Sequence, residues 1–182
     1  YKSKDLARKI ALVPQDTIID YEFPVEDIVL MGRHPYIGRL EKENEEDYKI
    51  VNEALRLTNT FYLKGRKINE ISGGERQRII IAKALAQKPD IILLDEPTSH
   101  LDINHQMEIL TLLKELNEKQ KMTIILVIHD INLGNRYSNN IILLDEGSII
   151  GIGKPSSVIN SNNIEKAYNL KIVPRTDDFT GR

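Results

Sequence analysis

The feature that most limits how this chain can fold is an alternation of apolar runs and helical segments that begins after residue 90. The runs at 91–94 (IILL) and 123–128 (TIILVI) are apolar, as is typical of parallel strands that are buried on both faces. The segment between them repeats apolar residues at helical spacing, at Ile103, Met107, Leu110, Leu113 and Leu116. This strand–helix–strand order predicts an α/β fold with a parallel sheet.

The residues before position 90 are mainly helical in pattern. A short apolar strand at 10–13 comes first, followed by a helix near 25–31 with Gly32 as its stop, and by a helix over 43–57. We therefore expect three parts: a core strand and the loop after it (1–17), an inserted α-helical subdomain (18–88), and the rest of the sheet core (89–182). A further strand is expected at 171–173.

Composition excludes several classes of function. The chain has no cysteine, which rules out disulfides and thiolate chemistry, and its net charge of −2 gives no electrostatic reason to expect a nucleic-acid partner. The longest clean apolar run, at 124–128, is far shorter than the roughly 20 residues of a membrane span. The chain opens with polar residues and without Met, so we expect residue 1 to be an internal point of a longer protein.

The sequence ISGGE at 71–75 precedes an apolar helix that Pro89 ends. Ser72 as N-cap and Glu75 three residues later form a capping box. Capping does not explain Gly73 and Gly74, since each glycine costs a helix about 1 kcal/mol relative to alanine. Bare backbone N–H groups at a helix N-terminus suit an approaching phosphate, so we interpret this turn as a phosphate-binding site.

Two adjacent carboxylates, Asp95 and Glu96, end the strand at 91–94. Ligands of open α/β sheets bind beyond the carboxyl ends of the strands, where Asp95 can hold Mg²⁺ and Glu96 can polarise a water molecule. His129 follows the strand at 123–128 and could donate a hydrogen bond to a terminal phosphate. Gln15 follows the strand at 10–13 and could contact Mg²⁺ or the water, although it is a weak candidate by itself.

The hexapeptide IILLDE occurs twice, at 91–96 and at 141–146. The second copy is followed by Gly147 and another β-rich run, so we predict a hairpin whose acids point to solvent. The chain has no sequence of the form G-x-x-x-x-G-K-[ST], the usual phosphate loop. The nearest imitation, at 147–156, has its first glycine one position too early and a proline after the lysine.

Five motifs together resemble those of the ATP-binding cassette (ABC) ATPases, in family order and at family-like spacing over almost the whole chain. The sequence at 71–75 resembles the signature motif, usually L-S-G-G-Q, and IILLDEP at 91–97 resembles the Walker B strand with its catalytic glutamate. The others are similar to the D-loop at 99–102 (SHLD), the switch histidine at His129 and the Q-loop glutamine at Gln15. The departures are Ile71 for Leu, Glu75 for Gln, and the absent phosphate loop.

The resemblance implies a P-loop NTPase-like fold that uses ATP and Mg²⁺. It implies that Asp95 and Gln15 bind Mg²⁺, that Glu96 acts on the attacking water, and that His129 contacts the γ-phosphate. It also implies a homodimer of two ABC ATPase subunits arranged head to tail. The nucleotide of the partner would then be contacted by Ser72, Gly73, Gly74 and Glu75, and Asp102 would communicate across the dimer.

Three further segments, KDLARKIALVPQ, MGRHPYIG and LDINHQMEIL, resemble the ATPase subunits of importers for iron–siderophore, haem and cobalamin compounds. This implies polytopic membrane permease subunits as partners, a substrate-binding protein as an indirect partner, and a peripheral position on the cytoplasmic face of the cell membrane. Because the phosphate loop is absent, these 182 residues alone are expected not to hydrolyse ATP.

Three alternatives remain open from the sequence. The parent protein could belong to another ABC transporter subfamily. It could be a soluble ABC-class ATPase acting in DNA repair or on ribosomes, although neither a long coiled-coil insertion nor a second cassette is visible in this chain. It could also be a non-catalytic interaction module with the same fold, although Asp95, Glu96 and His129 are all intact.

Overall fold

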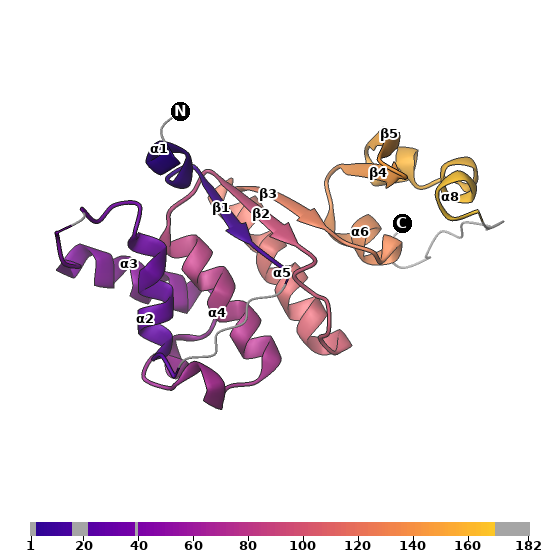
Figure 1. Cartoon of the computed structure of the whole chain (residues 1–182). Helices are drawn as coiled ribbons and strands as arrows, with labels where there is room; N and C mark the ends of the chain where they lie inside the picture. Colours follow the sequence, from indigo (N-terminus) through magenta and orange to yellow (C-terminus); the bar gives the residue numbers. More distant parts are fainter. Residues whose placement is uncertain (1–2, 16–21, 39, 170–182) are drawn as a thin grey trace. The chain divides into compact units, whose positions relative to one another are not determined.

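The computed structural model describes residues 3–15, 22–38 and 40–169. The chain forms two compact units, Tyr1–Val127 and Ile128–Arg182, and each is described by itself (Figure 1). None of the described helices is both long enough and apolar enough to cross a membrane.

The first unit mixes helices and strands in the order that the sequence predicts. Its regular elements are α1 (Ser3–Ala7), β1 (Ile10–Val13), α2 (Val25–Leu30), η1 (Met31–Arg33), α3 (Glu45–Leu57), η2 (Phe61–Leu63), η3 (Ile68–Glu70), α4 (Gly73–Ala86), β2 (Ile91–Asp95), α5 (Ile103–Gln120) and β3 (Thr123–Val127). Between β1 and β2 the described regular elements are all helical, which agrees with a helical segment inserted into an α/β core.

The three strands of this unit form a parallel sheet in the order β1-β2-β3, visible side by side in Figure 1. Val13 pairs with Leu94, and Asp95 pairs with Val127, so the carboxyl ends of the strands lie at one edge of the sheet. The residues that follow β1 and β2 therefore begin at neighbouring positions, and these are the positions of Gln15 and Glu96.

The sheet is well buried on one face, which corrects the expectation of strands buried on both. Residues of α4 and α5 join Ala11, Val13, Ile92 and Leu94 in one apolar core. On the opposite face, the exposed fractions of Leu12, Ile125 and Val127 are 64%, 53% and 50%. The sequence of an apolar strand cannot show which of its faces a helix will cover, because both faces have the same composition.

Helices α2, α3 and α4 pack together into the helical part of the first unit. The sequence predicts Gly32 as the stop of α2, but it lies inside the short 3₁₀ turn η1 that follows α2 directly, and it is buried. A Cβ atom at this position would lie 2.2 Å from the carbonyl oxygen of Lys83 in α4. Gly32 therefore allows the backbones of η1 and α4 to approach closely, a constraint set by tertiary packing.

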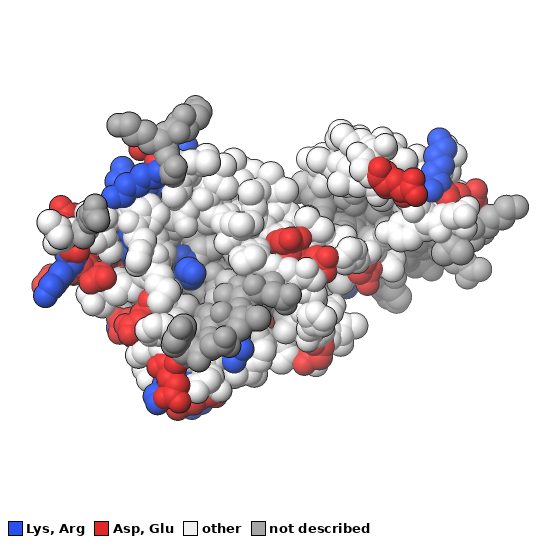
Figure 2. Space-filling view, in the orientation of Figure 1, with Lys and Arg blue, Asp and Glu red and all other residues white. Residues whose placement is uncertain are grey.

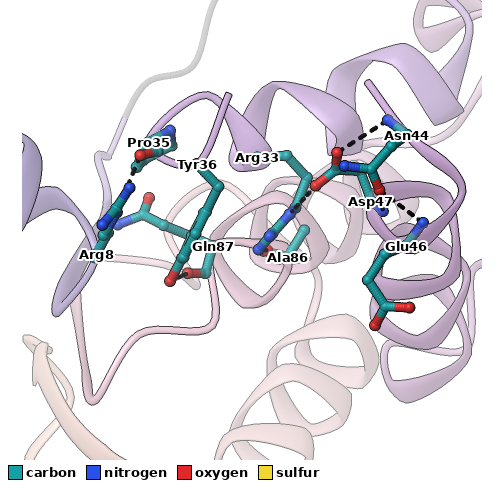
Figure 3. Close-up of polar contacts among 9 residues, drawn as sticks. All are labelled: Arg8, Arg33, Pro35, Tyr36, Asn44, Glu46, Asp47, Ala86 and Gln87. Carbon is teal, nitrogen blue, oxygen red and sulfur yellow. Dashed lines mark hydrogen bonds and ion pairs between the residues drawn. The ribbon is translucent and has the colours of Figure 1, made fainter. Parts of the chain in front are cut away.

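A buried ion pair joins the loop after α2 to α3 (Figure 3). Arg33 Nε donates to Asp47 Oδ1 at 2.9 Å, and Arg33 Nη1 donates to the carbonyl of Ala86 at 2.8 Å. Burial raises the pKa of Asp47, but hydrogen bonds from the Asn44 N–H and from Arg33, together with the Arg33 charge, outweigh burial and lower it. The ionised pair is satisfied on both sides, as a buried pair needs to be.

The same loop is tied to the strand that precedes Gln15. The Arg33 guanidinium lies 4.0 Å from the centre of the Tyr36 ring, and the Tyr36 hydroxyl donates to the carbonyl of Gln87 at 3.0 Å. Arg8, between α1 and β1, donates from Nε to the carbonyl of Pro35 at 3.1 Å (Figure 3). The helical part is thereby linked to the start of β1 by side chains as well as by the chain itself.

The second unit contains the predicted hairpin. Its described elements are α6 (Ile131–Tyr137), β4 (Ile141–Asp145), β5 (Ser148–Gly153), α7 (Pro155–Val158) and α8 (Ser161–Tyr168). Strands β4 and β5 are antiparallel, and Asp145 pairs with Ser148 across the turn formed by Glu146 and Gly147. Both turn residues have positive φ, 43° and 76°, as a type I′ turn requires. The strand expected at 171–173 lies outside the described residues.

Candidate functional site

The structure brings Gln15 and Glu96 into direct contact. Gln15 follows β1 and Glu96 follows β2, and these strands are parallel neighbours in register. The side-chain amide nitrogen of Gln15 donates a hydrogen bond of 3.0 Å to Glu96 Oε2. Two side chains 81 positions apart in the sequence therefore meet at the carboxyl edge of the sheet, and the amide oxygen of Gln15 is left as an acceptor.

The backbone at Glu96 is held in an unusual conformation. Its φ is +45°, a left-handed value that costs a residue with a Cβ roughly 1–2 kcal/mol. The Ser99 backbone N–H and hydroxyl both donate to the Glu96 carbonyl, at 3.1 and 2.8 Å. Pro97 and Thr98 are buried. The turn after β2 is thus fixed by packing and hydrogen bonds, which sets the direction in which the Glu96 side chain leaves the sheet.

Asp95 is the last residue of β2 and is exposed to solvent. Among the described residues, no group of three or more His, Asp or Glu side chains could hold a metal ion by itself. A divalent ion at Asp95 would therefore need oxygen ligands from water and from a bound phosphate, which is how Mg²⁺ is commonly held. In Figure 2 the acidic and basic side chains of the visible face are scattered in small groups of either sign.

The N-terminus of α4 has the capping box that the sequence predicts. The Ser72 hydroxyl accepts a bond from the Glu75 N–H at 3.3 Å, and Glu75 Oε2 accepts bonds from the Ser72 N–H and hydroxyl, both at 2.9 Å. Tyr62, in η2, adds a hydrogen bond of 2.8 Å to Glu75 Oε1. The Ser72 N–H, the Tyr62 hydroxyl and the Ser72 hydroxyl together lower the pKa of Glu75, so its carboxylate is charged at neutral pH.

The two glycines of this turn have different surroundings. Gly73 is exposed, and a Cβ added there would have its nearest contact with Leu101, at 3.8 Å. Gly74 is buried, and a Cβ there would lie 2.1 Å from Cδ2 of His105. The interpretation of both glycines as openings for an outside group thus accounts for Gly73, whereas the space beside Gly74 is taken by a side chain of the same molecule.

Asp102 is the N-cap of α5. His105, in the same helix, contacts Asp102 and lies against this turn of α4. Oδ1 of Asp102 accepts the His105 N–H at 3.0 Å, and Oδ2 of Asp102 lies 2.7 Å from His105 Nδ1. These two contacts with His105, backbone first and then side chain, lower the pKa of Asp102. Sequence reasoning identified Asp102 but missed His105. Its position three residues after a capping aspartate signals the contact with Asp102, whereas no sequence signal marks its contact with Gly74.

His129 lies in the second unit, two residues after the end of β3, and its side chain is exposed. The contacts described above join Gln15 to Glu96, and Asp102 through His105 to Gly74, all within the first unit. The role of His129 toward a terminal phosphate stays a prediction from sequence.

Known proteins resemble the chain in sequence. The sequence profile described as ABC transporter matches residues 1–99. The petrobactin import ATP-binding protein FpuD of Bacillus anthracis is 39% identical over 99% of this chain and 66% of its own length. The ferric enterobactin transport ATP-binding protein FepC of Escherichia coli is 38% identical over 100% and 67%. The chain thus spans about two thirds of the length of these relatives.

Solved structures show the same fold. A transporter described as a metal-chelate type ABC transporter, in an inward-facing conformation, superposes with a TM-score of 0.90 at 33% identity, over 96% of this chain and 69% of that one. The ATP-binding cassette MJ0796, solved as a dimer bound to ADP and Pi, gives a TM-score of 0.69 at 34% identity, over 84% and 66%.

Proposed function

The chain belongs to the ABC transporter family, and from this premise we propose that it is part of the ATP-binding and ATP-hydrolysing subunit of an importer. The observation that carries the proposal is the hydrogen bond between Gln15 and Glu96 at the carboxyl edge of the parallel sheet. This contact holds a carboxylate at the end of a strand that also presents Asp95, where nucleotides bind in α/β folds.

The residues of the first unit fit Mg²⁺ and an attacking water. Asp95 and the amide oxygen of Gln15 offer oxygen ligands, the type that Mg²⁺ prefers, while the amide nitrogen of Gln15 is directed to Glu96. Bound Mg²⁺ would neutralise charge on the phosphates. Glu96 accepts a proton from water as general base, and the hydrogen bond from Gln15 fixes the direction of its carboxylate. We propose that His129 donates a hydrogen bond to the γ-phosphate.

The N-terminus of α4 serves the nucleotide of a second subunit. Ser72 and Gly73 are exposed there, and Gly73 leaves room for a phosphate against the helix N-terminus. Glu75 stands where the family usually has glutamine, and its charged carboxylate holds the Ser72 hydroxyl. A phosphate that binds Ser72 therefore competes with Glu75 for this hydroxyl hydrogen. Asp102, which His105 connects to the N-terminus of α4, provides communication across the dimer.

The transported compound is of the iron–siderophore, haem or cobalamin type. The names of the relatives support this class, since they include importers of petrobactin, ferric enterobactin and cobalamin. The partners are a second copy of the subunit and a polytopic permease at the cytoplasmic face of the membrane, with a substrate-binding protein acting through the permease. We assign permease contact to the loop after Gln15 and to the loop around Arg33 to Arg39; residues 16–21 and 39 of these loops lie outside the described residues. The division into 1–17, 18–88 and 89–182 remains a prediction.

The enzymatic part of the proposal is tested with a chimera. The chain is joined at its N-terminus to a segment of a family member that contains a G-x-x-x-x-G-K-[ST] loop, because the chain has no such sequence. The chimera should hydrolyse ATP in the presence of Mg²⁺, whereas the 182 residues alone should not. A folded chimera that binds ATP without turnover would show an interaction module and contradict the proposal.

The transport part is tested by co-expression. The chimera should co-purify from detergent-solubilised membranes with the permease of an iron–siderophore importer, and this association should raise or lower its ATPase rate. Hydrolysis by a chimera that associates with ribosomes or DNA, and not with a permease, would favour a soluble ABC-class ATPase instead.

A further inference from the structure

We propose that His105 is a positioning residue that holds Asp102 against the N-terminus of α4, and that glycine is needed at position 74 to make room for its imidazole ring. This inference rests on the proposed function, in which Ser72 and Gly73 bind a nucleotide and Asp102 lies at the dimer contact. It concerns a residue that lies in the segment LDINHQMEIL and to which the resemblance described above assigns no role.

The His105 ring is oriented by the carboxylate of Asp102. One carboxylate oxygen accepts the backbone N–H of His105 at 3.0 Å, and the other lies 2.7 Å from Nδ1 of the same residue. With both oxygens engaged by one residue, neither the carboxylate nor the ring can turn without losing a hydrogen bond. The Nδ1 edge of the ring faces Asp102, and the Cδ2–Nε2 edge is left for other contacts.

That second edge lies on Gly74. A Cβ atom at position 74 would be 2.1 Å from Cδ2, 2.6 Å from Cγ and 2.9 Å from Nε2 of His105. These distances are too short for any side chain, and a ring fixed by Asp102 cannot move aside without breaking the contacts just described. The neighbouring Gly73 would meet Leu101 only at 3.8 Å, an ordinary contact. The two glycines therefore differ in steric demand, and only Gly74 is constrained by His105.

His105 therefore couples two segments of the proposed nucleotide site. The imidazole connects the N-cap of α5 to the first turn of α4, and an ion pair between Arg78 and Glu108 joins the same two helices one turn further along. A displacement of Asp102 when a second subunit docks would therefore be transmitted to the backbone N–H groups at Ser72 and Gly73. Because this link lies within one subunit, it exists before the dimer forms.

The test is a double-mutant cycle in the chimera, with ATP hydrolysis and urea unfolding as readouts. Gly74→Ala should lower the unfolding midpoint and raise the KM for ATP, whereas Gly73→Ala should leave the midpoint unchanged. In a His105→Ala background, Gly74→Ala should cause no further loss in either measurement, because the clash is gone. An equal loss in both backgrounds would show that Gly74 is needed for a reason other than His105 and would overturn the proposal.

The positioning role is tested by a conservative replacement. Asn can place its Nδ2 where His has Nδ1, so His105→Asn keeps a donor to Asp102. We expect His105→Ala to reduce kcat/KM about tenfold, and His105→Asn to recover most of that loss at an unchanged unfolding midpoint. Identical kinetics for the two variants would contradict the role. If the parent chimera does not hydrolyse ATP, the proposed function fails, while the cycle measured by unfolding alone still decides the contact between His105 and Gly74.

Discussion

The two copies of IILLDE have the same six residues and different structures. The first forms β2, the central strand of a parallel sheet, and the second forms β4, one strand of an antiparallel hairpin. Their glutamates share a left-handed backbone, with φ of +45° at Glu96 and +43° at Glu146. Glu96 nevertheless meets Gln15, whereas Glu146 is an exposed turn residue. The neighbouring strand, and not the motif, decides which carboxylate has a partner.

Burial separates the copies in the same way. Ile92 and Leu94 are exposed by 0% and 2%, whereas the matching Ile142 and Leu144 are exposed by 59% and 61%. Strand β2 has a neighbour on each side and α4 and α5 in the same apolar core, whereas β4 pairs, within the described residues, with β5 alone. A buried central strand therefore holds the residue that follows it at a defined position, as a catalytic side chain requires.

The largest difference that this comparison predicts is in stability. Ile92→Ala removes a fully buried side chain and should lower the free energy of unfolding by about 2–5 kcal/mol. The matched Ile142→Ala should change it by no more than about 0.5 kcal/mol, because that side chain is mostly exposed. Urea unfolding followed by circular dichroism measures both. Equal losses would mean that the two strands are equally buried in solution.

A second difference is the amide partner that only the first copy has within the described structure. Gln15→Leu removes the hydrogen bond to Glu96 together with the proposed oxygen ligand for Mg²⁺, and should lower kcat of the chimera about tenfold. Gln120→Leu, at an exposed position at the end of α5, is the control and should leave kcat unchanged. A Gln15→Leu variant with full activity would remove the structural reason for treating Glu96 as the positioned carboxylate.

The smallest effect concerns the hairpin turn. Asn is favoured before Gly in type I′ turns, so Glu146→Asn should stabilise the protein by about 0.5 kcal/mol without changing ATP hydrolysis. The matched Glu96→Asn also replaces a glutamate of positive φ but gives up the contact with Gln15 and the proposed base, so it should lose activity. Chemical denaturation and steady-state assays of both variants measure the contrast. Loss of hydrolysis in Glu146→Asn would refute the assignment of the second copy to a structural turn.

Sequence patterns predicted the features that depend on neighbouring residues. The capping box at Ser72 and Glu75 and the turn at Glu146 and Gly147 are confirmed, because each is specified by two or three adjacent side chains. The parallel order of the strands is confirmed as well, since apolar runs separated by helices allow few other topologies. The contact between Gln15 and Glu96 follows from that order once the register of β1 and β2 is known.

Features set by tertiary packing were not predictable in this way. The sequence favours a helix stop at Gly32, but the carbonyl of Lys83 explains this glycine, and Lys83 lies 51 positions away. Exposure of Leu12 and Ile125 depends on which face of the sheet the helices cover. The sequence does not predict the contact of His105 with Gly74, because it joins two helices across 31 positions and no local pattern marks such a contact.

The central claim is that the first copy of the hexapeptide holds the catalytic carboxylate and the second does not. The most direct measurement is the steady-state rate of Mg²⁺-dependent ATP hydrolysis by the chimera with Glu96→Gln and, separately, with Glu146→Gln. Glu96→Gln should keep ATP binding and lose turnover by at least about a hundredfold, because the amide cannot act as a base. Glu146→Gln should hydrolyse ATP at the parent rate. Unchanged turnover in Glu96→Gln, or an equal loss in both variants, would contradict the account.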